Sequence, residues 1–292
     1  MALSASPEVD LWSIQSLLYR EFMTTDHSLS TATSEPNAGA AALRALHVPG
    51  SPLVLPNVWD AASARAVTAA GFPVVATGSA AVAPALGYAD GEATPAGVMF
   101  DAVARIVRAV PVPVTADLER GYGLAPAELV ERIAATGAVG FNLEDSDPGT
   151  GAMVDAGEQA DYLAAVRAAA AGAGVDLVIN ARVDTFAHGE GSPRERLAEA
   201  VERGRRYLRA GADCVYPILL AEAEAIRTLV AEVGGPVNVL FRPGVPSLAE
   251  LGELGVARVS FGHGLHAAAQ AYLATMLEAI KSGRSPYIPS AG

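Results

Sequence analysis

The sequence almost lacks lysine: Lys281 is the only one among 292 residues. It lies in the last apolar helical stretch, beside Ser282 and Gly283, close to the C-terminal tail. Schiff-base aldolases, pyridoxal-phosphate enzymes and P-loop nucleotide hydrolases each need a lysine inside their site. The sequence therefore argues against all three classes.

Cysteine is equally scarce, because Cys214 is the only one. An intrachain disulfide and a cysteine metal cluster are excluded, and we expect Cys214 to be a small buried residue within a strand. Apolar runs long enough to span a membrane are also missing, and the N-terminus lacks the basic start and apolar core of a secretory signal. We expect a soluble cytoplasmic protein that does not bind membranes.

Positive charge is in short supply as well. The chain has 20 Lys and Arg residues against 32 Asp and Glu, which gives a net charge of −12. A nucleic-acid partner would want a basic face, so none is expected. An anionic substrate would need local cations or a metal ion.

The length suits one barrel domain, which commonly needs about 250 residues. We read residues 1–50 as an N-terminal extension, partly disordered, because the stretch from Thr24 to Pro36 is rich in Ser and Thr. A first helix over Ala40 to Leu46 leads into the catalytic domain, which we place at residues 51–292.

Eight apolar stretches alternate with segments of helical periodicity. The predicted strands are Leu53 to Val58, Val74 to Gly78, Val112 to Leu118, Val139 to Leu143, Leu177 to Arg182, Cys214 to Leu219, Val237 to Phe241 and Arg258 to Phe261. The helical segments include Ala61 to Ala70, Pro95 to Ala109, Pro126 to Thr136, Pro193 to Ala210 and Ala221 to Val233. This pattern predicts an α/β protein of the (β/α)8 barrel type. A doubly wound open sheet is the alternative, but the first strand is followed by Asn57-Val58-Trp59-Asp60 and not by G-x-G-x-x-G.

Three acids follow two consecutive strands. Asp117 and Glu119 are two residues apart and leave one strand end on the same side, and Glu144 ends the next strand. If these strands are parallel neighbours, the carboxylates converge at one rim, and oxygen ligands suit Mg²⁺, with Mn²⁺ as a substitute. The pattern predicts a metal site.

Other strand ends offer groups for a small anion. The small residues Thr77 to Ala81 form either a close-packed turn or an anion-binding nest. Arg182 follows an apolar run and would be costly there unless it pairs with the acids or with a substrate carboxylate. Asn57 also ends a strand, whereas Arg242 either binds substrate or shapes the turn Arg242-Pro243-Gly244.

Several of these motifs resemble the isocitrate lyase and phosphoenolpyruvate mutase superfamily, in order and with similar spacing, from about Leu53 to about Leu273. They are Asn57-Val58-Trp59-Asp60, Leu86-Gly87-Tyr88-Ala89-Asp90, Asp117-Leu118-Glu119-Arg120-Gly121-Tyr122-Gly123, Leu143-Glu144-Asp145 and Asn180-Ala181-Arg182-Val183-Asp184. The resemblance implies a (β/α)8 barrel that swaps its last helix between subunits. It also implies a homo-oligomer, a dimer or tetramer, that uses Mg²⁺ to hold a 2-oxo acid or enolate while a C–C or P–C bond is made or broken.

The resemblance assigns roles by position. Asp117, Glu119 and Glu144 match the metal-binding acids, and Arg182 matches an arginine that contacts substrate. The turn Gly78-Ser79-Ala80 matches the place that holds the substrate carboxylate. Asp90 matches an aspartate near the metal or the transferring group.

One stretch departs from the superfamily pattern. Its lyases carry a lid with a basic pair and Cys-Gly-His, whereas the corresponding residues here, Ser146 to Ala156, contain no Cys, Lys, Arg or His. The glycines in this stretch still favour a mobile lid. The proton donor stays open between Tyr122 and a water molecule.

These features predict a Mg²⁺-dependent enzyme that acts on a small 2-oxo or 2-hydroxy carboxylate through an enolate. A carbon–carbon lyase or hydrolase of the oxaloacetate or 2-alkylmalate type is the first interpretation. Phosphonomutase or phosphonopyruvate hydrolase chemistry is the alternative within enzymes. A barrel that binds a 2-oxo acid without turnover is the alternative outside them.

Overall fold

The computed structural model describes residues 37–287, which fall into two compact units divided between His266 and Ala267. The greater part of the predicted extension, residues 1–36, lies outside the described residues. The helix predicted at Ala40 to Leu46 is confirmed as α2, Ala38–Ala45. Its Ala40 and Leu43 pack against Leu53 and Leu55, so α2 belongs to the barrel core, and the domain boundary at residue 50 stays a prediction.

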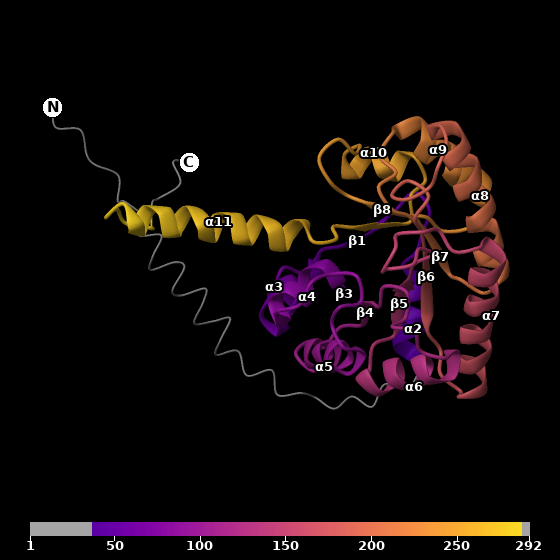
Figure 1. The fold of residues 1–292 in the computed structure, drawn as a ribbon, viewed down its shortest axis with the longest axis horizontal. Coiled ribbons are helices and arrows are strands. Elements are labelled where there is room, and N and C mark those ends of the chain that lie inside the picture. Colours follow the sequence, from indigo (N-terminus) through magenta and orange to yellow (C-terminus); the bar gives the residue numbers. More distant parts are fainter. Residues whose placement is uncertain (1–36, 288–292) are drawn as a thin grey trace. The chain divides into compact units, whose positions relative to one another are not determined.

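The described strands form one closed parallel barrel (Figure 1). They are β1 Leu53–Leu55, β2 Asn57–Val58, β3 Val75–Thr77, β4 Val114–Asp117, β5 Gly140–Leu143, β6 Val178–Val183, β7 Cys214–Pro217, β8 Asn238–Leu240 and β9 Arg258–Ser260. One sheet has the order β2-β3-β4-β5-β6-β7 and the other β1-β9-β8. A bridge from Val215 to Val237 joins β7 to β8, and β1 runs into β2, so the ring closes and the predicted (β/α)8 barrel is confirmed.

Each predicted strand has its counterpart, with one interruption. The stretch from Leu53 to Val58 is divided into β1 and β2 at Pro56, which has no N–H to give to a neighbouring strand. On one side of the break β1 pairs with β9, and on the other side β2 pairs with β3. The proline therefore lies where the strand passes from one neighbour to the other.

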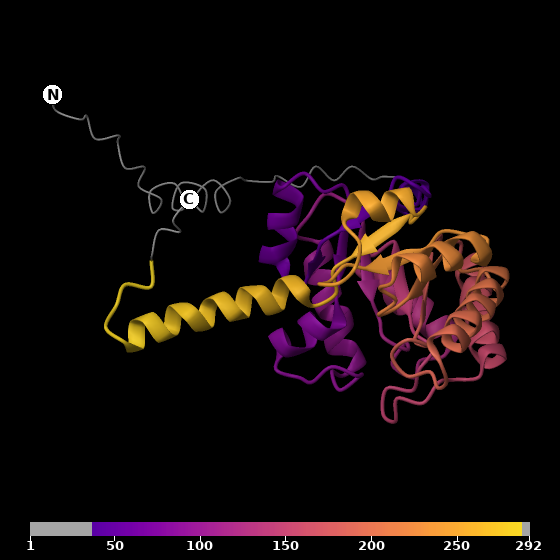
Figure 2. The ribbon, with the colours of Figure 1, turned by 90° about the horizontal axis from the view of Figure 1, so that it is seen from above.

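Helices surround the strands, as Figures 1 and 2 show. They are α3 Ala61–Ala69, α4 Ser79–Leu86, α5 Ala96–Val107, α6 Pro126–Thr136, α7 Ala156–Gly172, α8 Pro193–Arg209, α9 Ala223–Val233 and α10 Leu248–Glu253. The last helix, α11 Gly264–Lys281, belongs from Ala267 onward to the second compact unit. The five named helical segments are confirmed to within a few residues. The turn predicted for Thr77 to Ala81 is wrong in its second half, because a helix begins at Ser79 and continues through Pro84.

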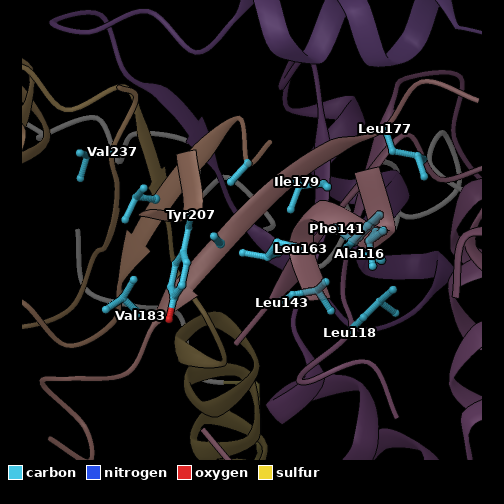
Figure 3. Close-up of a cluster of buried hydrophobic side chains, with 14 of the residues drawn as sticks. Ala116, Leu118, Phe141, Leu143, Leu163, Leu177, Ile179, Val183, Tyr207 and Val237 are labelled. Atoms are coloured by element: carbon cyan, nitrogen blue, oxygen red, sulfur yellow. The ribbon is translucent and has the colours of Figure 1, made fainter. Parts of the chain in front are cut away.

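The main core lies between the sheet and the helices. Phe141, Leu143 and Ile179 from β5 and β6 meet Leu163 of α7 and Tyr207 of α8, and all five are fully buried (Figure 3). Because side chains alternate along a strand, the residues between them face the barrel axis. Asn142 and Glu144 therefore point inward, whereas Asp145 points outward toward α8.

The last helix, α11, carries an apolar stripe formed by Leu265, Ala269, Leu273 and Leu277. Its Leu265, Leu273 and Leu277 are 39%, 46% and 55% exposed. None of the helices in the described part of the chain is both long enough and apolar enough to cross a membrane. The exchange of this helix between subunits stays a prediction.

Candidate active site

A polar cavity of about 170 Å³ opens where β3 to β6 end. This is smaller than the roughly 300 to 1,000 Å³ of sites for drug-sized ligands, so it suits a molecule of a few carbon atoms. Its wall is formed by Ser79, Asp90, Gly91, Glu119, Glu144, Ser146, Asp147, Pro148, Gly151, Arg182 and His188. In a (β/α)8 barrel this rim is where the chemistry takes place.

Asp117 ends β4 and lies directly behind Ser79. Its Oδ2 accepts hydrogen bonds from the Ser79 N–H and from the Ser79 hydroxyl, both at 2.9 Å. Since Ser79 is the first residue of α4, the positive end of the helix dipole also stabilises the carboxylate. The Gly78 N–H donates to Val58, so among the residues that the structure describes only Ala80 of the predicted carboxylate-binding turn keeps an N–H without an acceptor.

Glu119 is buried and strained. Its φ of +50° is rare for a residue with a side chain, and such strain clusters at functional sites. The carboxylate accepts a 2.6 Å hydrogen bond from the Glu92 N–H and another of 2.6 Å from the Tyr122 hydroxyl. Burial raises the pKa of Glu119 to about 7, and the charges of Asp117 and Asp90 add to this shift.

Glu92, which was not predicted as a site residue, supports this loop directly. Its carboxylate accepts hydrogen bonds from the backbone N–H groups of Arg120 at 3.0 Å and Tyr122 at 2.6 Å. Glu92 and Tyr122 also have positive φ angles. Two strained segments therefore hold each other in place beside the cavity.

Tyr122, a predicted proton donor, is placed behind Glu119. Its hydroxyl already donates to that carboxylate, and Tyr122 is not among the described residues that line the cavity. Burial and the neighbouring Glu119 raise the pKa of Tyr122 well above its ordinary value. The hydroxyl therefore serves to orient Glu119.

Arg182 joins two buried acids on the cavity wall. It forms an ion pair with Glu144 and a second with Asp184, where Nε lies 2.6 Å from Oδ1. Burial raises the pKa of Glu144, and the charge of Arg182 opposes that shift. Of the two predicted options, pairing with the acids is confirmed, and the guanidinium still faces the cavity.

Asp145 fixes the base of the predicted lid from outside the barrel. Its Oδ2 accepts from the Tyr207 hydroxyl at 2.7 Å and from Arg203 at 3.1 Å, and its Oδ1 accepts from the Asp184 N–H at 2.8 Å. Arg203 also donates to the Val154 carbonyl at 2.9 Å. One buried carboxylate thus ties together β5, β6, α8 and the end of the lid.

The remaining predicted site residues are dispersed. Asp90 is exposed at the cavity mouth, where desolvation and the charge of Asp117 raise its pKa. Asn57 joins strands, because it donates to the Thr77 carbonyl at 2.7 Å and accepts from the Phe261 N–H at 2.7 Å. Arg242 lines a different, apolar hollow and donates to the Leu219 carbonyl at 3.1 Å, so it is not brought to the cavity.

The lid stretch forms a short hairpin over the cavity. Ser146 bridges Met153, and the Asp147 carboxylate accepts from the N–H groups of Gly149 and Thr150 at 3.1 and 2.8 Å. Asp147, Pro148 and Gly151 line the cavity together with His188 from the loop after β6. His188 was not predicted, because it lies outside every motif.

The residues present fit a divalent cation. The described cavity wall carries four carboxylates, from Asp90, Glu119, Glu144 and Asp147, against the guanidinium of Arg182. No three acidic, histidine or cysteine side chains in residues 37–287 form a closed ligand set, so the predicted convergence of Asp117, Glu119 and Glu144 is only partial. Mg²⁺ commonly binds through one or two carboxylates and keeps several waters, which suits oxygen donors spaced in this way.

The fold and the site together define the class, a (β/α)8 barrel with an acid-rich cavity at the carboxyl ends of its strands. The model of the phosphoenolpyruvate phosphomutase family matches residues 43–281. The chain is 35% identical over 234 residues to an uncharacterised protein of Mycobacterium tuberculosis, covering 77% of this chain and 85% of that protein. It is 30% identical over 259 residues to an oxaloacetate decarboxylase of Rhodopseudomonas palustris, covering 84% and 86%.

Solved structures agree with this assignment. A candidate phosphonomutase from Burkholderia cenocepacia superposes with a TM-score of 0.80 at 45% identity, covering 83% of this chain and all of the other. The chain therefore belongs to the phosphoenolpyruvate phosphomutase family, within the phosphoenolpyruvate mutase and isocitrate lyase superfamily that its motifs resemble. Members of this superfamily are lyases, mutases and hydrolases that act on 2-oxo acids and depend on a divalent metal.

Proposed function

We propose that this protein is a Mg²⁺-dependent enzyme that breaks a carbon–carbon bond in a small 2-oxo or 2-hydroxy dicarboxylate through an enolate. The observation that carries the proposal is the cavity of about 170 Å³ in which Arg182 faces a wall of carboxylates. One cation suits a substrate carboxylate, and the surplus of acids suits a metal ion that neutralises the second anionic end.

In this proposal Asp117, Glu119 and Glu144 hold Mg²⁺, in part through water, and Mn²⁺ is a substitute. When bound, the cation supplies Lewis acidity that polarises the 2-oxo group and lowers the cost of the enolate. Arg182 and the Ala80 N–H hold the substrate carboxylate, and Asp90 orders a water at the cavity mouth. The strained loop around Glu119 keeps its carboxylate in position before substrate arrives.

An oxaloacetate-type substrate has support from both size and charge. An oxaloacetate decarboxylase is among the relatives that match most of the chain. Its substrate carries two carboxylates, whereas phosphonopyruvate carries a third negative charge, which four wall carboxylates would oppose. The carbon–carbon reaction is therefore the first candidate.

The test compares Asp117→Ala with Asp161→Ala, a control that removes an exposed aspartate on α7. We expect wild type and the control to consume a 2-oxo dicarboxylate with Mg²⁺ and to stop with EDTA. We expect Asp117→Ala to lose at least 100-fold in kcat/KM, in line with about 10² or more for one lost electrostatic group. Undiminished turnover by Asp117→Ala, or turnover that survives EDTA, contradicts the proposed site.

Phosphorus chemistry is the second candidate. The family name and the Burkholderia cenocepacia structure at 45% identity favour it. A phosphorus-31 spectrum of phosphonopyruvate incubated with protein and Mg²⁺ distinguishes the two candidates. A new phosphate or phosphate-ester resonance supports phosphonopyruvate hydrolysis or the mutase reaction, and an unchanged spectrum beside active carbon–carbon cleavage rejects both.

A further inference from the structure

We infer that His188 is the proton donor to the enolate carbon, the role for which the lid stretch supplies no side chain. The inference rests on the proposed function. His188 comes from the turn after β6 and lines the same cavity as Arg182, Glu144 and Asp90. It thus brings an imidazole to a site whose lid residues, Ser146 to Ala156, include no histidine or cysteine.

Three hydroxyl groups at or beside the cavity already donate hydrogen bonds to carboxylates. The Ser79 hydroxyl donates to Asp117, the Ser146 hydroxyl donates to Asp184, and the Tyr122 hydroxyl donates to Glu119. Arg182 is held between two carboxylates and stays charged. Among the described residues of the wall, His188 alone carries an imidazole, the side chain that most often serves as a general acid or base.

The backbone around His188 is built to place this ring. The Ala187 and His188 N–H groups both donate to the Asp184 carbonyl, at 2.9 and 2.8 Å, which winds the chain back over the strand end. Residue 189 must be glycine, because a Cβ there would lie 2.4 Å from the Thr185 carbonyl oxygen. The turn that carries the imidazole is therefore tightly fixed.

The lid approaches the His188 ring at Gly151, where the absence of a side chain leaves space for the imidazole. A Cβ at Gly151 would lie 3.3 Å from Nδ1 and 3.4 Å from Cε1 of His188, and Gly151 has a φ of +71°. The imidazole thus packs against bare lid backbone. His188 is also exposed, so solvent can return the proton after each turnover.

The step balances for decarboxylation of a 2-oxo dicarboxylate. The bond between carbon 3 and the departing carboxylate breaks, carbon dioxide leaves, and the electron pair stays as the enolate. The imidazolium N–H then gives its proton to carbon 3, the 2-oxo group re-forms, and water reprotonates the neutral imidazole. General acid catalysis of this kind is typically worth 10² to 10⁴ in rate.

The test uses stereochemistry, because proton delivery need not limit the rate. The probe is 3-methyloxaloacetate with Mg²⁺ in D₂O, and the products are analysed for the configuration at the deuterated carbon. The variants are His188→Gln and His188→Ala, and the control is His263→Gln, an exposed histidine that lines the separate apolar hollow. Each variant is first checked for an unchanged circular dichroism spectrum.

We expect wild type and the control to deliver deuterium to one face. We expect His188→Gln to deliver it to both faces equally and to lose 10² to 10⁴ in rate where protonation limits turnover, about 10² being the lower bound for a general acid. Added imidazole should restore part of the rate to His188→Ala. The NMR signal of the His188 imidazole is assigned as the one that is lost in His188→Gln. In wild type this signal should shift when oxalate and Mg²⁺ are added.

Two failures are distinguishable. If wild type turns over and His188→Gln gives the same rate and the same single-face product, the inference is overturned while the proposed function stands. If wild type converts no 2-oxo or 2-hydroxy dicarboxylate, the proposed function is overturned and the role of His188 falls with it.

Discussion

Arg182 combines a structural role with the proposed binding role. It is the positive partner of Glu144 and Asp184, whose side chains are 8% and 0% exposed. The positive charge of Arg182 offsets part of the free-energy cost of burying two carboxylates. The pairing of Arg182 with the acid cluster, to which Glu144 belongs, was predictable from the sequence. Asp184 was not predicted as the second partner, because it reaches Arg182 only once the β6 backbone is fixed.

We predict that Arg182→Met lowers the free energy of unfolding by about 3 to 5 kcal/mol, because it leaves buried carboxylates without a partner. The measurement is urea unfolding at pH 7. The double variant Arg182→Met with Glu144→Gln should recover part of the loss, since one of the stranded charges is then removed. A double variant no more stable than the single one would show that Glu144 does not depend on this pair.

His47 gives a pH test that is independent of the active site. Its Nδ1–H donates to the Leu43 carbonyl at 2.8 Å, and its Nε2 is buried with no partner in the described part of the chain. Burial lowers the pKa of His47 to about 4, and the charge of Arg258 adds to this effect. The folded state therefore resists protonation of His47.

The sign of the linkage follows from a lowered pKa. The contribution of His47 is fully present above the unfolded pKa of about 6.5 and is lost as the pH falls from there toward 4. Between pH 7 and pH 5 we predict that wild type loses about 2 kcal/mol more than His47→Gln in urea unfolding. Parallel losses in the two proteins would contradict the lowered pKa.

At the scale of secondary-structure elements, periodicity predicted the strands and most helices. The segment Pro126 to Thr136 was predicted to the residue, because its proline start and its apolar spacing are both strong signals. Helix α4 was missed, because Ser79 to Leu86 consists of small residues and contains Pro84, which reads as a turn. Its dipole nevertheless explains why Asp117 points at Ser79.

The loops that complete the site could not be predicted from spacing. Glu92 holds the Glu119 loop from 27 residues away, and His188 meets the lid only after the turn at Asp184 has formed. Both contacts depend on backbone angles or close approaches that no short motif encodes. The acid pair and Arg182 were found because they end strands, whereas these two residues lie in connections.

The turn that carries His188 makes its own prediction. Gly189→Ala should lower the free energy of unfolding by about 1 to 3 kcal/mol, because the new Cβ would press on the Thr185 carbonyl oxygen. It should also reduce turnover, as we expect the replacement of His188 to do. Gly172→Ala is the matched control, because nothing lies within 4 Å of a Cβ added at that position in α7, so both stability and turnover should be retained.

At the scale of the whole molecule, the barrel itself was predictable from the count and order of apolar stretches. The assembly was not, because the stripe of α11 suits a partner or its own barrel equally well in sequence. We propose that the protein is a homo-oligomer, a dimer or tetramer, supported by the exposure of Leu273 and Leu277 at 46% and 55%.

Light scattering coupled to size-exclusion chromatography tests this assembly. We predict a mass of two or four chains for wild type and a smaller species for the double variant Leu273→Glu with Leu277→Glu, because two charges would be desolvated at the contact. Ala271→Glu adds a charge two positions from Leu273, on the opposite side of the helix, and should keep the wild-type mass. A monomeric wild type would reject the proposed assembly.

The central claim is a metal-dependent carbon–carbon reaction in the cavity at the ends of β3 to β6. It is tested most directly by a proton and phosphorus NMR time course of the full chain with Mg²⁺, beside an EDTA control. The substrates are oxaloacetate, 2-alkylmalates, methylisocitrate and phosphonopyruvate. We predict that one of the carbon substrates is converted, that EDTA abolishes the conversion, and that the phosphorus resonance does not move. Conversion of phosphonopyruvate alone, or bound 2-oxo acids that stay intact, would contradict the account.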